Sequence, residues 1–147
     1  MCRSFAPDLM RRLGVENFVA LYGSGAVLAS LGSLVYKLST NSFQPSLGAS
    51  GAIMFMVSMT ACMWPDANFG LLFLPGVTFR AIDMLAAIAC LDMLGLARGW
   101  QMLDHAAHLT GSALGLLLIK GGGYAALLDY QNWLVSKYRK WRKTAGF

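Results

Sequence analysis

The fold is decided by an uncharged run, LSTNSFQPSLGASGAIMFMVSMTACMWP, which covers residues 38–65. A second uncharged run covers residues 18–36. A helix that crosses a membrane needs about 20 mostly apolar residues, so each run is long enough for one crossing. Charged residues make up 13% of the chain, whereas an ordinary soluble domain has about 25%. We therefore expect lipid, rather than water, to be the solvent for most of this chain.

Outward from these runs, the apolar segments and their breaks predict an all-α fold, a polytopic bundle of transmembrane helices. Four spans are expected, over residues 15–38, 48–64, 78–97 and 103–119. They form one membrane domain over residues 15–120, which follows a polar flank over residues 1–14. In the first span, Gly25, Ala29 and Gly32 recur near one helical turn, which predicts close packing of a neighbouring helix.

Residues 121–147 form a basic and aromatic tail. Five of its apolar residues recur three or four positions apart and predict an amphipathic helix: Leu127, Tyr130, Leu134, Tyr138 and Trp141. The net charge of +5 arises mostly from five cations near the end: Lys137, Arg139, Lys140, Arg142 and Lys143. Such a run can bind nucleic acid, but beside membrane spans it more commonly lies on a lipid surface. We therefore expect membrane lipid, and no nucleic acid, as its partner, with both basic ends on one membrane face.

The third predicted span, residues 78–97, contains three charged side chains. Arg80 and Asp83 are close together near its start, where they can pair or reach the interface. Asp92 lies deeper, and a carboxyl group there is costly unless it faces the protein interior, so it is a candidate functional residue. A protonated or hydrogen-bonded structural acid is the alternative, and a small-solute transporter is a more distant one. Before this span, residues 69–74 are too few to cross and are expected to form a buried linker or a segment in the interface.

Ser50 and His108 are expected at similar depth, because the spans that carry them enter from the same membrane face. A serine hydroxyl is a weak nucleophile until a base within hydrogen-bond reach takes its proton, and histidine suits that role near neutral pH. A developing oxyanion also needs donors, and the Ser50 N–H at the start of a helix can supply one. Gly48 and Gly51 beside the serine let the backbone and a substrate come close.

The face of the fourth span that carries His108 is lined by small residues. At about 100° per residue, Gly111, Ser112 and Gly115 lie on the same side of that helix as His108. A glycine pair one turn apart favours close helix packing. Two membrane helices that merely pack together would leave the same pattern, so the residues alone leave the catalytic and the structural interpretation open.

No metal site and no cofactor are predicted. Cys2, Cys62 and Cys90 are odd in number and lack the spacing of zinc ligands, and they form no disulfide framework. His105 and His108 lie one helical turn apart, but no third ligand is evident and the His-Glu-x-x-His pattern of metalloproteases is absent.

Two motifs together resemble the paired signature of rhomboid intramembrane serine proteases. The first is PSLGASGA, residues 45–52, and the second is DHAAHLTGSALG, residues 104–115. The resemblance is to the mitochondrial presenilin-associated rhomboid-like subfamily in particular and extends over residues 4–120. It implies that Ser50 is the nucleophile and His108 the general base of a Ser-His dyad. It also implies a serine endopeptidase, a hydrolase that cleaves transmembrane segments of membrane proteins in the mitochondrial inner membrane.

The chain departs from the family pattern at its beginning. The family core has six helices, and its second helix carries His and Asn side chains that support the oxyanion. The four predicted spans correspond to core helices three to six, so no residue here matches that His and Asn. We expect this chain to represent a fragment of a longer protein, a shortened isoform or an inactive relative, and the retained dyad favours the first. The alternative function is a non-catalytic membrane protein that binds transmembrane helices.

Overall fold

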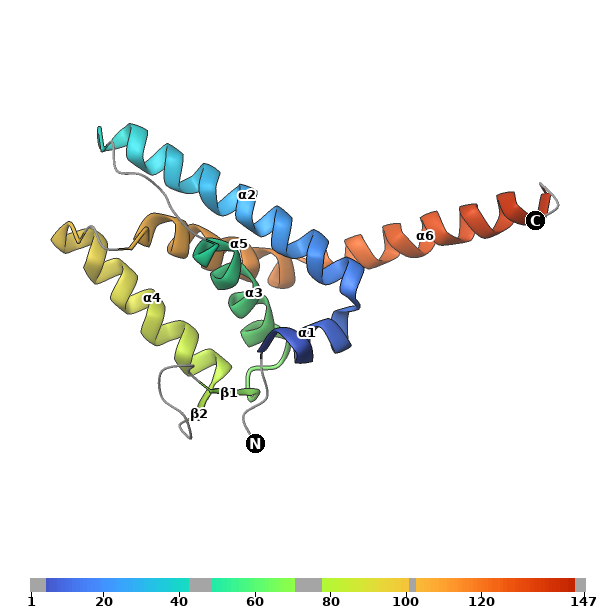
Figure 1. Cartoon of the computed structure of the whole chain (residues 1–147), viewed down its shortest axis with the longest axis horizontal. Coiled ribbons are helices and arrows are strands. Elements are labelled where there is room, and N and C mark those ends of the chain that lie inside the picture. Colours follow the sequence, from blue (N-terminus) through green and yellow to red (C-terminus); the bar gives the residue numbers. More distant parts are fainter. Residues whose placement is uncertain (1–4, 43–48, 71–77, 101–102, 145–147) are drawn as a thin grey trace.

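The computed structural model describes residues 5–42, 49–70, 78–100 and 103–144, and most of them are helical. In chain order the elements are α1 (Phe5–Leu13), α2 (Val15–Ser39), α3 (Ser50–Met63), β1 (Asn68–Gly70), β2 (Thr78–Arg80), α4 (Ala81–Arg98), α5 (His105–Lys120) and α6 (Gly123–Thr144). The helices α2 to α5 overlap the four predicted spans, and the all-α fold class is confirmed. These helices cluster together, and α6 extends away from them (Figure 1).

Among the described residues, α2 is the one helix that is long and apolar enough to cross a membrane by itself. The helices α5 and α6 meet the same criteria only as a pair, and they are bent by 65° at the break between them. The helix α3 is apolar but has 14 residues, fewer than the roughly 20 that a crossing needs. The number of spans therefore stays a prediction.

The centre of the bundle is α3, which packs against α2, α4 and α5. Ten of its 14 residues are buried. On one side its large side chains join a first hydrophobic cluster of Leu9, Leu13, Leu21, Phe55, Met56 and Met59. On the other side they join a second cluster of Met54, Val57, Ala61, Ala81 and Leu85. Because α3 is held from both sides, packing fixes the position of its first residue, Ser50.

The helix α2 packs through one narrow stripe. Its buried residues recur at every fourth position: Leu21, Gly25, Ala29 and Ser33. A Cβ on Gly25 would lie 2.7 Å from the Phe55 ring, and a Cβ on Gly32 would overlap Thr110. These close approaches confirm the predicted packing role of the small residues. Outside this stripe α2 exposes large apolar side chains, as a helix facing lipid does: Val15, Val19, Val27, Leu28, Leu31, Leu34, Val35 and Leu38.

A short β-hairpin precedes α4, where a linker and the start of a span were expected. The predicted linker, residues 69–74, begins in β1 and continues outside the described residues. The predicted span over residues 78–97 is wrong at its start, because its first 3 residues form β2 and pair antiparallel with β1. Strand pairing satisfies the backbone groups of this segment, and its threonine and phenylalanine favour strands. Arg80 pairs at the surface with Asp66 rather than with Asp83.

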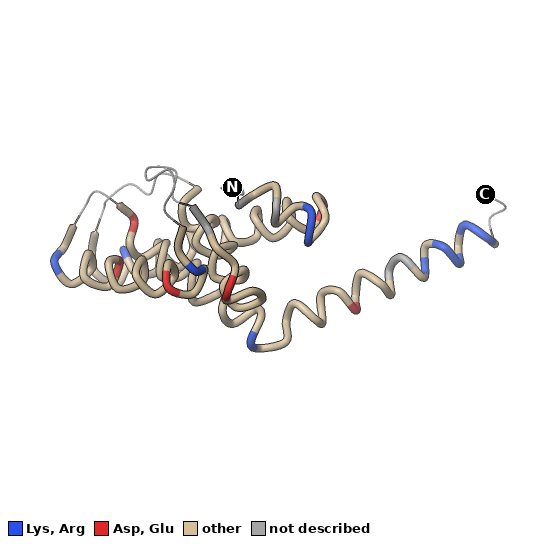
Figure 2. The backbone as a smooth tube through the Cα atoms, turned by 90° about the horizontal axis from the view of Figure 1, so that it is seen from below, with Lys and Arg blue, Asp and Glu red and all other residues tan. Residues whose placement is uncertain are grey.

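The helix α6 leaves the bundle after a turn of three glycines, residues 121–123. Gly122 has a φ of +74°, which glycine adopts without strain. The first turn of α6 still touches the first hydrophobic cluster through Tyr124 and Leu127, and burial raises the pKa of the Tyr124 phenol. The rest of the helix projects outward, with most of its cations toward the C-terminal end (Figure 2). Its role at a lipid surface stays a prediction.

Candidate active site

Two glycines of α5 lie directly on the backbone of α3. A Cβ on Gly111 would overlap the Gly51 carbonyl oxygen, and a Cβ on Gly115 would overlap the Phe55 carbonyl oxygen. Both contacts advance by one helical turn in the same direction, so α3 and α5 run parallel and begin at the same end of the bundle. Further along the interface, Ser58 Oγ donates a hydrogen bond of 2.6 Å to the carbonyl of Ser112. The start of α3 therefore lies beside the first turns of α5.

Ser50 is the first residue of α3 and is partly exposed. The next residue, Gly51, lies so close to α5 that a Cβ on it would be 3.3 Å from the Ala107 carbonyl oxygen. Ala107 immediately precedes His108, so the backbone places Ser50 beside the turn that carries His108. The first N–H groups of a helix have no intrahelical acceptor, which leaves the Ser50 N–H available for a partner outside the helix. Gly48, also predicted to support this site, lies outside the described residues.

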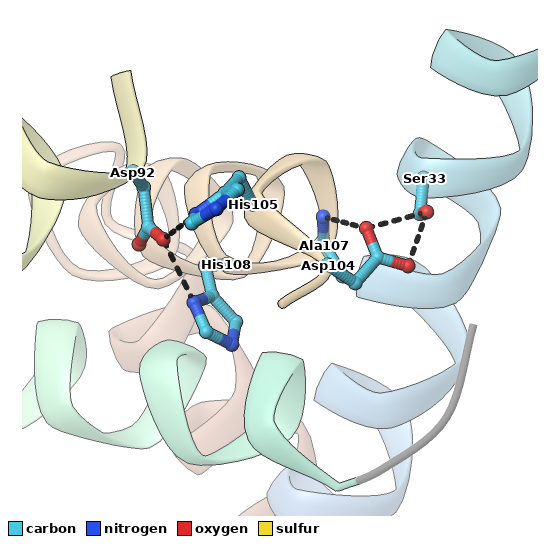
Figure 3. A network of polar contacts seen from close by, with 6 residues as sticks. All are labelled: Ser33, Asp92, Asp104, His105, Ala107 and His108. Atoms are coloured by element: carbon cyan, nitrogen blue, oxygen red, sulfur yellow. Dashed lines mark hydrogen bonds and ion pairs between the residues drawn. The ribbon is translucent and has the colours of Figure 1, made fainter. Parts of the chain in front are cut away.

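His108 belongs to a buried cluster of three titratable side chains (Figure 3). Asp92 Oδ1, on α4, lies 2.7 Å from His105 Nδ1 and 3.0 Å from His108 Nδ1. Asp92, His105 and His108 are 2%, 5% and 7% exposed. The His108 ring extends from α5 toward α3, while both Nδ1 atoms face the one carboxylate (Figure 3). Asp92 is thus hydrogen-bonded, and these contacts agree with either a functional or a structural acid.

Three atoms of this cluster have no hydrogen-bond partner among the described residues: Asp92 Oδ2, His105 Nε2 and His108 Nε2. The Ser50 hydroxyl and the His108 ring, brought to the same end of two helices, are therefore not hydrogen-bonded to each other. Catalytic hydrogen bonds are often long or poorly aligned without substrate. Since His108 Nδ1 contacts Asp92, its Nε2 is the ring nitrogen left to accept a proton.

The start of α5 is anchored by Asp104, which the sequence analysis did not single out. Its Oδ1 accepts a hydrogen bond of 3.0 Å from the Ala107 N–H, so Asp104 caps the helix. The same carboxylate accepts from Ser33 Oγ at 2.7 and 2.8 Å and pairs with Lys37 Nζ at 2.9 Å. These contacts tie the first turn of α5 to α2. An aspartate just before an apolar helical run is the signal that could have identified the cap.

A third potential ligand does lie beside His105 and His108, so the expectation that none is evident is wrong. Donor atoms of Asp92 and the two histidines all lie within 4.8 Å of one another. Sequence spacing missed Asp92 because α4 and α5 bring it in from a separate helix. Histidine and aspartate are ligand types that hold zinc. The two short N···O distances, however, have the geometry of ordinary hydrogen bonds.

The fold and the site define a helical protein with a serine and a histidine on adjacent parallel helices. Residues 1–124 match the Rhomboid domain family. The chain belongs to the rhomboid family, which confirms the resemblance inferred from its two motifs.

Similar proteins are mitochondrial rhomboids. Presenilin-associated rhomboid-like protein A of Danio rerio is 41% identical over 119 residues, which cover 81% of this chain and 31% of the relative. The Homo sapiens presenilin-associated rhomboid-like protein is 40% identical over the same share of each chain. Rhomboid protein 1 of Saccharomyces cerevisiae is 38% identical over 116 residues, 78% of this chain and 33% of the relative.

The chain thus spans about a third of the length of these relatives. No solved structure matches it. With a rhomboid domain and relatives named mitochondrial, the chain is an integral mitochondrial membrane protein.

Proposed function

We propose that this chain carries the nucleophile and the general base of a rhomboid-type intramembrane serine endopeptidase. The observation that supports this most directly is the backbone contact between Gly111 and Gly51, which sets α5 against the start of α3. It brings Ser50 and His108 to one end of a parallel helix pair. The proposed substrates are transmembrane segments of membrane proteins in the mitochondrial inner membrane.

In the proposed reaction, Ser50 Oγ attacks the carbonyl carbon of a peptide bond while His108 Nε2 takes the hydroxyl proton. The Ser50 N–H and the positive end of the α3 dipole stabilise the oxyanion of the tetrahedral intermediate. His108 then gives its proton to the leaving amine, and an acyl-enzyme remains on Ser50. Water attacks this ester as His108 takes the water's proton. His108 finally returns that proton to Ser50 as the carboxylic acid product leaves.

A fluorophosphonate probe tests the assignment of Ser50, since its fluoride is displaced only by an activated serine oxygen. In lipid bilayers the full-length protein should be labelled, and Ser50→Ala should lose the label. Ser30→Ala, which alters an exposed serine on α2, is the matched control and should label normally. Equal labelling of Ser50→Ala and the unaltered protein would contradict the proposal.

A second function is a rhomboid-like protein that binds transmembrane helices without cleaving them. The observation in its favour is that His108 Nε2 has no hydrogen-bond partner among the described residues, the Ser50 hydroxyl included. This function predicts that a membrane-protein partner co-purifies equally well with Ser50→Ala, and that no partner is cleaved. Accumulation of an uncut partner only in Ser50→Ala would instead support the protease.

A further inference from the structure

One carboxylate oxygen serves two imidazole rings. Asp92 Oδ1 lies 2.7 Å from His105 Nδ1 and 3.0 Å from His108 Nδ1, in a site where all three side chains are buried. A buried carboxylate is strongly destabilising unless donors compensate for its lost hydration. The two ring nitrogens can provide that compensation only if each carries a proton, because a carboxylate oxygen only accepts.

This requirement decides the tautomer of both histidines. A neutral imidazole carries one proton, so a proton on Nδ1 leaves Nε2 as an acceptor. His108 Nε2 is buried and has no hydrogen-bond partner among the described residues, and its ring extends from α5 toward α3 (Figure 3). Of the two His108 nitrogens, Nε2 is therefore the basic one.

The geometry of α4 holds the second imidazole in place. A Cβ on Gly95 would overlap the His105 ring, so the absence of a side chain at Gly95 opens the slot that this ring occupies. The Trp100 ring lies beside it, with centroids 6.3 Å apart. His105 thus lies against α4 while its Nδ1 contacts Asp92 Oδ1, which restrains the carboxylate.

We propose that Asp92 is a positioning residue that fixes His108 in the Nδ1–H tautomer, with Nε2 aimed at Ser50, and that His105 holds Asp92 in that orientation. The catalytic consequence rests on the proposed function, whereas the tautomer does not. The carboxylate also stabilises the imidazolium that forms when His108 takes the serine proton. Asp92 and His108 would then act with Ser50 as a triad assembled from three helices.

Nitrogen-15 NMR of the imidazole rings tests the tautomer directly. The chain has 2 histidines, and both belong to this cluster, so selective labelling of histidine reports on nothing else. In lipid bilayers each ring should show a protonated Nδ1 and an unprotonated Nε2, and Asp92→Ala should shift His108 toward the other tautomer. Asp83→Asn, which alters an exposed acid on the same helix, should leave the spectrum unchanged. Protonated Nε2 atoms in the unaltered protein would overturn the proposal, as would a His108 tautomer that Asp92→Ala leaves in place.

A metal ion held by the same three residues is a competing explanation with its own outcome. It would replace the Nδ1 protons, so a chelator would change the spectrum, and that result would overturn the proposal. The spectrum of the unaltered protein needs no variant, so it remains decisive if Asp92→Ala does not fold.

Kinetics then tests the link to catalysis. Asp92→Ala should lower kcat for a transmembrane substrate by about 10²- to 10⁴-fold, the usual contribution of a positioned base, with KM little changed. Asp92→Asn keeps an acceptor oxygen and should recover part of the loss, whereas a rise in KM alone would overturn the positioning role. If Ser50→Ala still takes the fluorophosphonate label while the tautomer is as expected, the proposed function fails and the hydrogen-bond assignment stands.

Discussion

His105 and His108 look equivalent in the sequence, yet the fold assigns them different surroundings. Both bind the same oxygen of Asp92. His108 precedes Gly111 by less than one turn, on the face of α5 that rests on α3, whereas His105 occupies the slot beside Gly95 on α4. Only His108 therefore lies on the side of α5 that faces α3, where the proposed proton exchange with Ser50 would take place.

Substitution of the two histidines should separate these tasks. His108→Gln should lower the rate of fluorophosphonate labelling by about 10²-fold or more, because it removes the base. His105→Gln should lower the labelling rate by no more than about tenfold. A tenfold loss corresponds to about 1.4 kcal/mol, the contribution of one weakened hydrogen bond. Labelling rates measured at equal amounts of folded protein check this order, and a larger loss for His105→Gln would reverse the assignment.

At the residue scale, the motif pair leads to Ser50 and His108 as the proposed reacting residues, because each stands in a local pattern that can be read along the chain. The sequence marks Asp92 as a candidate functional residue because an acid is costly within an apolar run, but it does not indicate the partners of Asp92. Its two partners lie on another helix, and their approach depends on how α4 packs against α5, which no local periodicity contains. The contacts of Asp104 with Ser33 and Lys37 were missed for the same reason.

At the scale of helices, the interface of α3 and α5 is made of backbone rather than of side chains. Gly111→Ala would place a methyl group on the Gly51 carbonyl oxygen and force the two helices apart. Overpacking of this kind typically costs about 1–3 kcal/mol, so the midpoint of thermal unfolding in detergent should fall. Fluorophosphonate labelling of Ser50 should fall by more than the loss of folded protein accounts for, because the same shift would separate Ser50 from His108.

Gly23→Ala is the matched control for this glycine. A Cβ on Gly23 meets nothing within 4 Å among the described residues, and Gly23 lies in the interior of α2. Alanine is favoured over glycine in a helix by about 1 kcal/mol, so this variant should unfold at the same or a higher temperature. Equal effects of the two substitutions would mean that the contact between α3 and α5 does not decide stability.

The cap of α5 offers a second test at this scale. Asp104→Ala removes the acceptor of the Ala107 N–H together with the contacts to α2, and should destabilise the fold by about 1–2 kcal/mol or somewhat more. Asp104→Asn keeps an acceptor for the cap but weakens the pair with Lys37. Its unfolding midpoint should therefore lie between those of the unaltered protein and of Asp104→Ala. Asp129→Ala, at an exposed acid on α6, should be neutral. An Asp104→Ala protein as stable as the unaltered one would show that the cap is dispensable.

The helices were predictable because apolar length and turn residues act locally, and the observed boundaries of α2 and α5 lie close to the expected ones. The hairpin could not be predicted in this way, because each of its strands has only 3 residues and the two strands are separated in the sequence by residues 71–77. So short a segment carries no periodicity of its own. Its structure depends on whether a partner strand is present, which is a tertiary fact.

At the scale of the whole molecule, α6 projects away from the bundle and carries its cations near its C-terminal end (Figure 2). Its exposed rings include Tyr130, Trp133, Tyr138 and Trp141. Cations near an anionic lipid surface gain about 1 kcal/mol each. In vesicles that contain phosphatidylglycerol, trypsin should therefore cleave α6 more slowly than in vesicles of phosphatidylcholine alone.

Salt provides the control, because about 1 M salt shortens the range of the attraction to roughly 3 Å. The difference in the rate of trypsin cleavage between the two vesicle compositions should then become smaller. Cleavage at equal rates on both lipids at low salt would argue against a lipid-bound tail. Mass analysis of the fragments identifies the cleaved bonds.

The contact of Gly51 with Gly111 determines which positions of α3 and α5 tolerate substitution. Because main-chain atoms set the separation of α3 and α5, the spacing of the proposed reacting groups does not depend on the outward side chains of either helix. Those positions are free to adapt to different membranes or partners without disturbing the chemistry. The two glycines are the exception, since any heavier residue there would change the distance itself.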